Sequence, residues 1–445
     1  AQYGMLDDIR ETPAVIKSML SRFLLKTDPS DLLPRNGDPA TGSSLRSPSL
    51  ATRAKSIRID LPGMDAWLPS EHGLTGRTPL EVMAACSRRC TNRVMIIGSG
   101  SSHHAALAAE YLIEHIARVP VAVALASEFM YGKPIARPGD VFIVVSSSGE
   151  TVDAVESLRR IKSTKHGGSV LTVAVVNEAE STVARESDAV IHVGVGDERG
   201  VASTKVFSST IVAFVLLAVA LGEQCGVLSA AEKIRIVEML EEIPDKIQQV
   251  IQRESRALMK ADAAEHSLQV GECKLWDLGA QNVLSNNFIF LGRGFNYPIA
   301  LEGAMKCKEI AYIHAEGYPA AEMKHGPIAL IDQFMPVIVI APRSDPCYEK
   351  IRSNIEEVNA RCGATIAITE DDNHELDEIC EYVIHVPRTH EYLMPLVTMI
   401  PLQLLSYMMG VLRGNEVDHP RGLLKTISST DTGRGLSSSP VSDAA

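Results

Sequence analysis

Three hydroxyl-rich segments each follow a short apolar run in the first half of the sequence: GSGSSH (98–103), SSSGET (146–151) and GVASTK (200–205). In a parallel sheet, the carboxyl ends of the strands meet the N-termini of helices, whose free N–H groups favour anions. Serine and threonine hydroxyls add short donors without charge, which suits a tetrahedral phosphate ester. The candidate ligand-binding residues are Ser101, Ser102, Ser146, Ser147, Ser148, Thr151 and Ser203.

Each of these hydroxyls could instead cap its own helix, which is the commonest role of serine and threonine at such positions. Three segments of this kind within one predicted domain favour a shared ligand over three separate caps. Gly149 would let the backbone close around that ligand.

The segments belong to a regular alternation of short apolar runs and helical stretches. From Arg93 the runs are RVMIIG, VAVAL, VFIVVS, VLTVAVV and AVIHV, and from Phe288 they are FIFLGRG, MPVIVIAP, ATIAIT and YVIHVP. This alternation is typical of parallel sheets covered by helices on both faces.

The second series repeats the first. A shift of 194 positions places VMIIGSG (94–100) on FIFLGRG (288–294) and SEFMYG (127–132) on AEMKHG (321–326) without a gap. The fold class is therefore predicted as α/β, with two duplicated doubly wound three-layer domains and mainly parallel sheets. Only the first copy keeps the serine cluster, whereas the second carries charge and imidazole, so we expect one copy to bind and the other to react.

The predicted boundaries follow these patterns, with an early helix over Met5–Leu20 and a Pro/Ser/Gly-rich stretch, 26–75, interpreted as a mobile linker or surface loop. The predicted parts are an N-terminal helix and linker (1–80), a first domain (81–228), a helical connection (229–285), a second domain (286–428) and a polar tail (429–445).

Composition narrows the classes of partner. The 445 residues are 45% hydrophobic and 22% charged, enough to build two domains, and the net charge of −12 argues against nucleic acid or an anionic membrane as the main partner.

The eight cysteines form no CxxC motif, which is typical of reduced thiols in a cytoplasmic protein. No secretory signal is visible at the N-terminus, and we expect the apolar stretch 392–412 to be a buried helix rather than a membrane span.

The motifs SSSGET, GVASTKVF, LEGAMKCKEIAYIHAE, EMKHGPIALI and DHPRGLLK, in this order between about residues 90 and 427, resemble the sugar-isomerase half of the glutamine:fructose-6-phosphate aminotransferase family. The resemblance implies two phosphosugar-isomerase (SIS) domains, a phosphorylated hexose as substrate, and formation of glucosamine 6-phosphate from fructose 6-phosphate and ammonia. It implies no metal and no cofactor.

The resemblance also assigns roles by position. Glu309 would move the proton between C1 and C2, Lys306 would stabilise the enol-like intermediate, and Lys425 would form an imine with the open-chain sugar. His325 would open the sugar ring from the other subunit, which implies a homodimer. Val201 and Leu424 would contact the substrate. Without the resemblance, Lys306 and Glu309 are an i, i+3 pair that could equally be a solvent-exposed ion pair.

The sequence departs from the family in three places. No amidotransferase segment with a nucleophilic cysteine precedes the first domain, so we expect free ammonia, a separate glutaminase or another amine-supplying subunit. SSSGET replaces the family's SQSGET at Ser147, and PRGLLKTISS replaces PRNLAKSVTVE at Gly422 and Leu424. The alternatives are a hexosamine-phosphate deaminase, a plain phosphohexose isomerase, or a non-catalytic sensor of sugar phosphates. The presence of all four catalytic candidates, Lys306, Glu309, His325 and Lys425, favours an enzyme over a sensor.

Overall fold

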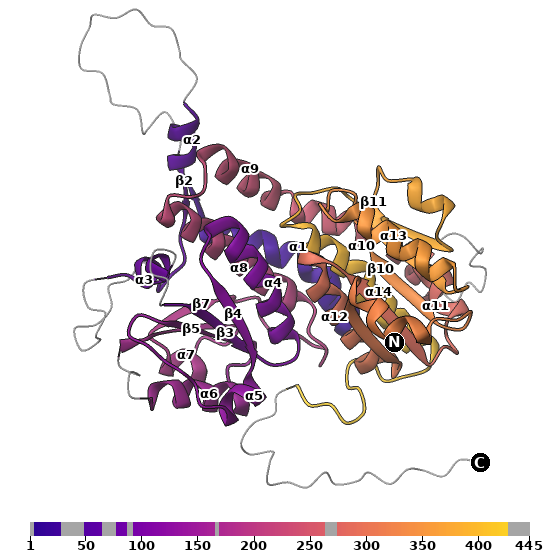
Figure 1. Cartoon of the computed structure of the whole chain (residues 1–445), viewed down its shortest axis with the longest axis horizontal. Helices are drawn as coiled ribbons and strands as arrows, with labels where there is room; N and C mark the ends of the chain where they lie inside the picture. The colour runs from indigo at the N-terminus through magenta and orange to yellow at the C-terminus, as the bar shows by residue number, and fades with distance from the viewer. Residues whose placement is uncertain are drawn as a thin grey trace, which may run out of the picture.

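The computed structural model describes residues 4–27, 49–64, 77–86, 92–164, 169–262 and 274–425, and it is organised around two five-stranded sheets (Figure 1). The strands of the first sheet are β3 (Val94–Gly98), β4 (Val121–Leu125), β5 (Val141–Ser146), β6 (Leu171–Val176) and β7 (Ala189–His192). Those of the second are β8 (Asn287–Gly292), β9 (His314–Pro319), β10 (Pro336–Ile340), β11 (Ala364–Glu370) and β12 (Tyr382–Val386).

Both sheets have the same topology. The spatial order is β4-β3-β5-β6-β7 in the first and β12-β11-β10-β8-β9 in the second, so each domain begins with its inner strand, adds one edge strand and then builds in the other direction. Every neighbouring pair within these two sheets is parallel. The predicted duplication and fold class are confirmed, and the burial of every residue of β5 and β6 is what a sheet covered on both faces requires.

Helices cover both faces of each sheet. The α-helices are α1 (Gly4–Phe23), α2 (Leu50–Ser56), α3 (Pro79–Cys86), α4 (Ser101–Ala117), α5 (Ala126–Tyr131), α6 (Val152–Lys162), α7 (Thr182–Glu186), α8 (Lys205–Cys225), α9 (Ala230–Glu241), α10 (Ile243–Asp262), α11 (Lys274–Gln281), α12 (Tyr297–Lys306), α13 (Tyr348–Asn359) and α14 (Met394–Leu412). Shorter turns are η3 (Gly294–Asn296), the π-helical η4 (Cys307–Ala311), η5 (Glu322–His325), η6 (Pro327–Leu330) and η7 (Glu375–Glu378).

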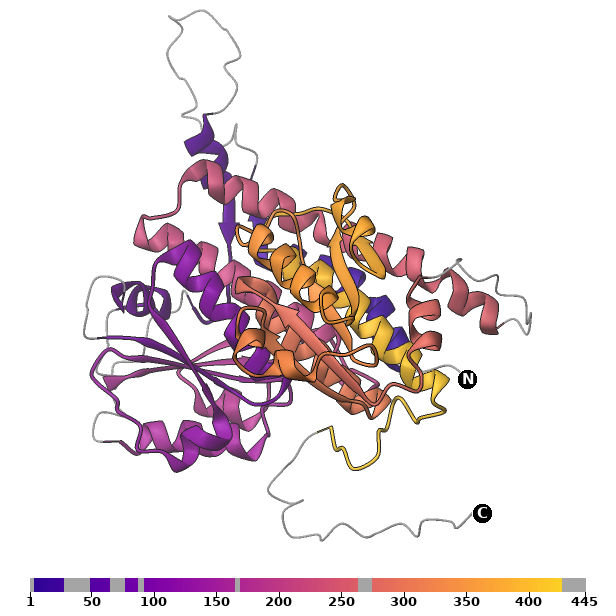
Figure 2. The same cartoon turned by 45° about the vertical axis from the view of Figure 1, so that its right-hand side comes forward.

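The two domains share a helical layer. Helices α4 and α8 of the first domain pack against each other, α12 packs on both α4 and α14, and α1 contacts α8, α10 and α14. One continuous apolar cluster therefore runs from the inner face of the first sheet to that of the second. Figures 1 and 2 show the two sheets on opposite sides of this layer. The layer fixes the second domain against the carboxyl edge of the first.

Two helices of the shared layer, α8 and α14, are long and apolar enough to cross a membrane by length and composition. In this structure 94% of the apolar window of α8 and 89% of that of α14 are buried inside the protein. The buried helix predicted for 392–412 is confirmed as α14, and both helices behave as core helices of a globular fold.

The structure corrects two sequence-based expectations. The stretch 26–75 is not wholly a linker, because residues 50–56 form α2 and Ile57–Ile59 (β2) pairs antiparallel with Leu24–Lys26 (β1). Strand β9 was not predicted, since its sequence HAEGYP lacks an apolar pattern. Residues 28–48 and 65–75 of the proposed linker and the whole predicted tail, 429–445, lie outside the described residues.

Candidate functional site

A cavity of about 440 Å³ lies at the carboxyl end of the first sheet. Its walls come from the loops after β3, β5, β6 and β7, from the start of α8, from the end of α12 with η4, and from the C-terminal segment 423–425. This is the edge of a parallel α/β sheet at which ligands bind. The second domain and the C-terminal segment complete it.

Most predicted ligand-binding residues line this cavity. They are Ser101, Ser102, Ser147, Ser148, Thr151, Val201, Ser203 and Leu424. Ser146 does not line it, because its side chain is buried behind the loop, where its hydroxyl accepts from the Gly149 amide at 3.1 Å and lies 3.2 Å from Thr151 Oγ1. Ser146 therefore shapes the serine loop from behind.

The serine loop depends on Gly149. Its φ is +62°, in the left-handed region, and a Cβ at this position would overlap the side chain of Ser181. Glu150 extends the same support, since its carboxylate accepts from the amide of Thr182 at 2.7 Å. The loop is thus packed against the turn that starts α7, which keeps its hydroxyls at the cavity wall.

Gly149→Ala is expected to lower the free energy of unfolding by about 2–3 kcal/mol, because it adds a clash to left-handed strain. The matched control is Gly226→Ala, where φ is +71° and nothing lies within 4 Å of an added Cβ. That variant should lose only about 1 kcal/mol. Urea denaturation of both variants measures the difference, and equal losses would show that the Ser181 contact does not constrain the loop.

Sequence reasoning missed several polar side chains of the cavity. Ser99 lines it with a buried hydroxyl that has no hydrogen-bond partner among the described residues. Asn177 and Glu178 follow β6, and Asp197 and Glu198 follow β7. These four residues could have been identified from their position after apolar strands. They were missed because neither segment contains a serine cluster.

Glu198 is the most buried of these carboxylates. One of its oxygens accepts from the amides of Thr204 at 2.7 Å and Val206 at 3.0 Å, at the start of α8. Burial raises the pKa of Glu198, and the two amide hydrogen bonds only partly oppose that effect. Glu198 therefore anchors the GVASTK loop at the cavity floor.

Lys205 in this loop faces away from the cavity. Its ammonium group is buried between Asp8 at 3.0 Å and Glu11 at 2.7 Å, both on α1. Asp8 also accepts from the amides of Arg199 and Gly200 at 2.8 and 2.9 Å. Helix α1 thus holds the loop in place, and Lys205, the last residue of the GVASTK segment, does not line the cavity.

The catalytic candidates of the second domain meet the cavity through a buried ion network. Glu309 lies in η4 and lines the cavity, with a carboxylate oxygen 2.5 Å from the Lys306 ammonium. Lys306 has no exposed side-chain surface and is also 3.3 Å from Glu302. The exposed ion pair considered for Lys306 and Glu309 is therefore excluded. A π turn is a frequent feature of functional sites because it re-aims side chains within a helix.

Glu302 ties this network to the first domain. It accepts from Ser101 Oγ at 2.8 Å and lies 2.7 Å from His104 Nδ1, both on α4. Burial alone would raise the pKa of Glu302, but the Lys306 ammonium and the His104 contact hold it below its usual value. For Lys306 the two effects have the opposite signs. Burial alone would lower the pKa of its ammonium group, but the nearby carboxylates of Glu302 and Glu309 raise that pKa above its usual value. Lys306 is thus a fixed cation, and it does not itself line the cavity.

Lys425 closes the cavity from the C-terminal side, and its ammonium donates to the backbone carbonyl of Glu198. The loop that carries it turns at Gly422, whose φ is +71°. Glycine and asparagine both tolerate this conformation, which explains physically how Gly422 replaces the family's asparagine. The exposed Leu424 side chain lies at the cavity mouth.

His325 is not brought to the cavity within one chain. It lies exposed at the end of η5 and does not line the cavity. Its neighbour Lys324 pairs with Glu357 of α13 at 2.6 Å.

Comparison with known proteins agrees with this geometry. The sequence profile of the SIS domain matches residues 89–220 and 284–413, which together exceed half of the chain. The chain belongs to the SIS-domain family. The two matched segments coincide with the two sheets and the helices packed on them.

This SIS-domain protein is similar to bacterial enzymes named glutamine–fructose-6-phosphate aminotransferase (isomerizing). Identity is 46% with the protein of Chlorobaculum tepidum over 76% of this chain and 51% of the relative, and 41% with that of Thermus thermophilus over 78% and 54%. The chain therefore spans about half the length of these curated relatives. Among solved structures, the C-terminal domain of glucosamine-fructose-6-phosphate aminotransferase from Francisella tularensis superposes with a TM-score of 0.69 at 28% identity, covering 94% of this chain and 98% of that one.

Proposed function

We propose that this chain aminates and isomerises fructose 6-phosphate to glucosamine 6-phosphate. The observation that carries the proposal is the position of Glu309, which faces the same cavity as the hydroxyl loops while the buried Lys306 fixes its carboxylate. The names of the relatives support the choice of substrate and product.

In the proposed complex, the phosphate lies against Ser102, Ser147 and Ser148, with the unpartnered Ser99 hydroxyl as a further donor. These groups bind an ester dianion with hydroxyls rather than side-chain cations. Ser101 is not counted as a donor, because its hydroxyl proton is donated to Glu302. The carboxylates of Glu178, Glu198 and Glu309 then face the uncharged part of the sugar and the cationic amine. This division suits a substrate that is anionic at one end only.

The chemistry proceeds from the open-chain ketose. Ammonia condenses with the C2 carbonyl and water leaves. Glu309 then removes a proton from C1 and returns it to C2, which converts the C2 imine and C1 hydroxyl into a C2 amine and C1 aldehyde. Lys425 would react with the carbonyl only as a free amine, so its ammonium group, which donates to the Glu198 carbonyl, must first lose a proton. The ammonia would come from solution or from a glutaminase.

The test is to incubate the purified chain with fructose 6-phosphate and ammonium and to separate the products chromatographically. We expect glucosamine 6-phosphate. Glucose 6-phosphate as the sole product would replace the proposal with a plain isomerase, and saturable binding of fructose 6-phosphate without turnover would replace it with a sensor.

We further propose that His325 of a second copy completes each cavity, as the family resemblance implies, so that the active form is a homodimer. Mixing Glu309→Gln and His325→Asn homodimers under subunit exchange tests this. Each mixed dimer would hold one intact site, so activity should recover to about one quarter of the unmodified value. Recovery would not occur if Glu309 and His325 acted within the same chain.

A further inference from the structure

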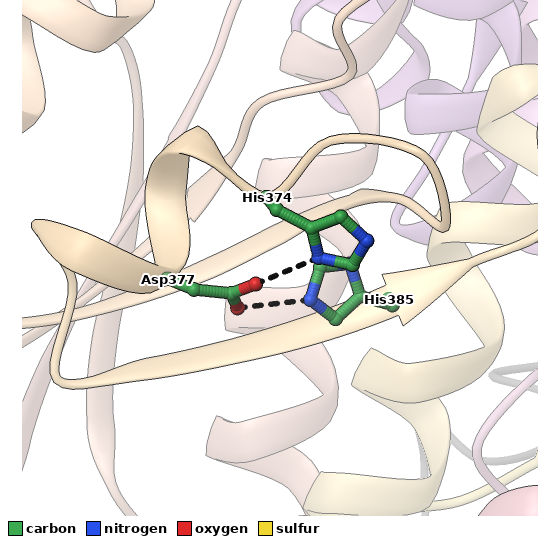
Figure 3. Close-up of side chains that lie close together, drawn as sticks. All are labelled: His374, Asp377 and His385. Atoms are coloured by element: carbon green, nitrogen blue, oxygen red, sulfur yellow. Dashed lines mark hydrogen bonds and ion pairs between the residues drawn. The ribbon is translucent and has the colours of Figure 1, made fainter.

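A second side-chain cluster of a different kind lies on the second domain, away from the cavity. His374 precedes η7, Asp377 lies within it, and His385 lies on β12 (Figure 3). One potential ligand atom from each residue falls within 4.8 Å of the other two. Neither the motifs nor the proposed function uses these residues, which belong to an otherwise acidic segment.

The carboxylate of Asp377 is directed at both rings. Its Oδ2 lies 2.9 Å from His374 Nδ1, and its Oδ1 lies 2.9 Å from His385 Nε2. Figure 3 shows the carboxylate facing the two imidazoles, which come from different elements. The three groups therefore converge on one point, in contrast to an ordinary surface ion pair between two long side chains.

His385 is held from behind in the manner of a metal ligand. Its Nδ1 lies 3.2 Å from the backbone carbonyl of Glu370, and because a carbonyl only accepts, Nδ1 is the donor. In the neutral ring, Nε2 is then the lone-pair nitrogen, and this is the atom that faces Asp377. Metal-binding histidines are commonly oriented by such a carbonyl.

The backbone around His385 is fixed as well. Arg253 of α10 donates to the His385 carbonyl at 2.8 Å and pairs with Asp371 at 2.8 Å. The His385 side chain is only 14% exposed, whereas that of His374 is 74% exposed. His385 is thus preorganised as a ligand, whereas the exposed His374 side chain can rotate to bind an incoming ion at low energetic cost.

We propose that His374, Asp377 and His385 form a binding site for a first-row divalent transition metal, with Zn²⁺ as the expected ion and water as the fourth ligand. Two imidazoles and one carboxylate suit Zn²⁺ and not Mg²⁺ or Ca²⁺, which require mostly oxygen ligands. Tetrahedral zinc places neighbouring ligand atoms about 3.3 Å apart. The two contacts of 2.9 Å must open by a few tenths of an ångström, and the exposed His374 ring can make that movement.

The bound ion joins η7 to the end of β12. Without it, η7 is held to the rest of the domain by the buried Leu376 side chain and by Glu375, which contacts Arg343 and Tyr348. An added cross-link from the ion stabilises the folded domain by mass action, because the unfolded chain does not hold the three ligands together. The inference does not depend on the proposed function, since the cluster does not line the cavity.

The test uses the full chain without a histidine tag, stripped of metal with a chelator and titrated with ZnCl₂ by calorimetry. We expect one saturable site per chain that depends on this cluster, a rise in melting temperature with Zn²⁺, and visible absorption typical of tetrahedral coordination with Co²⁺. His374→Gln and Asp377→Asn should each weaken Zn²⁺ binding roughly tenfold or more. Both positions are exposed enough for the variants to fold.

The matched control is Asp372→Asn, which removes an exposed carboxylate from the same loop, where it pairs with Arg388 at 2.9 Å. This variant should bind Zn²⁺ as the unmodified chain does. Absence of saturable binding would overturn the proposal, and so would equal affinity in the control and in the Asp377 and His374 variants.

Discussion

Glu309→Gln is expected to lower kcat for conversion of fructose 6-phosphate by about 10²–10⁴-fold, because an amide cannot carry the proton between C1 and C2. The dissociation constant of the sugar phosphate should stay within a few-fold, since the hydroxyl loops that hold the phosphate belong to the other domain. Glutamine still accepts a hydrogen bond from Lys306, which preserves the geometry around the substituted side chain. Steady-state kinetics and calorimetric titration with fructose 6-phosphate separate the two effects.

Glu316→Gln is the matched control for this variant. Glu316 lies on β9 and does not line the cavity. Among the described residues, its side chain makes only a 3.5 Å contact with Lys308, and the two side chains are each 43% exposed. Its turnover should equal that of the unmodified chain. Undiminished turnover in Glu309→Gln would remove Glu309 from the mechanism, and a parallel loss of binding would mean that the substitution disturbed the cavity instead.

Lys306→Met is expected to lower the free energy of unfolding by about 3–5 kcal/mol. Methionine fills most of the space of the lysine stem, so the loss reports the missing charge. Without the ammonium, the fully buried Glu302 carboxylate keeps only its contacts to Ser101 and His104. Chemical denaturation at neutral pH measures the loss. Adding Glu302→Gln to this variant should recover part of it, because the uncompensated charge is then removed.

Lys233→Met provides the comparison, because the Lys233 side chain is nearly as buried but its partner Glu223 is 53% exposed. Water can replace the lost ammonium there, so we expect a change of about 1 kcal/mol or less. If both lysine variants lose the same stability, the ion network around Lys306 contributes no more than a surface pair.

The repeat in the sequence predicts most of the architecture of the two domains. Its offset of 194 carries Val94 onto Phe288, and the structure places these residues on equivalent inner strands, β3 and β8. Apolar runs identify inner strands because both faces are covered. The edge strand β9 escaped prediction because an edge position tolerates glycine and proline. Gly317 is needed there, since a Cβ would lie 2.8 Å from the backbone of Leu301.

The serine loops could be predicted because one loop carries several hydroxyls within a few residues. The carboxylates of Glu198 and Glu302 could not, since each is a single residue whose role depends on distant contacts: Ser101 lies 201 positions from Glu302. The contact that holds the GVASTK loop on α1 could not be predicted either, because Lys205 donates to Glu11, which lies 194 positions earlier in the chain. Local spacing reports neighbours along one strand or helix, and these contacts are made between elements.

Asp418 joins three segments that the sequence keeps far apart. Its carboxylate accepts from the amides of Gly4 and Met5 at 2.7 and 2.8 Å, at the positive end of α1, and its carbonyl accepts from the amide of Val201 at 3.0 Å. The closing segment that ends at Lys425 begins just beyond it. Asp418 therefore links the first turn of α1 to the segment that carries Lys425. We expect the amides of Gly4 and Met5 to exchange with solvent more slowly when a substrate orders that segment.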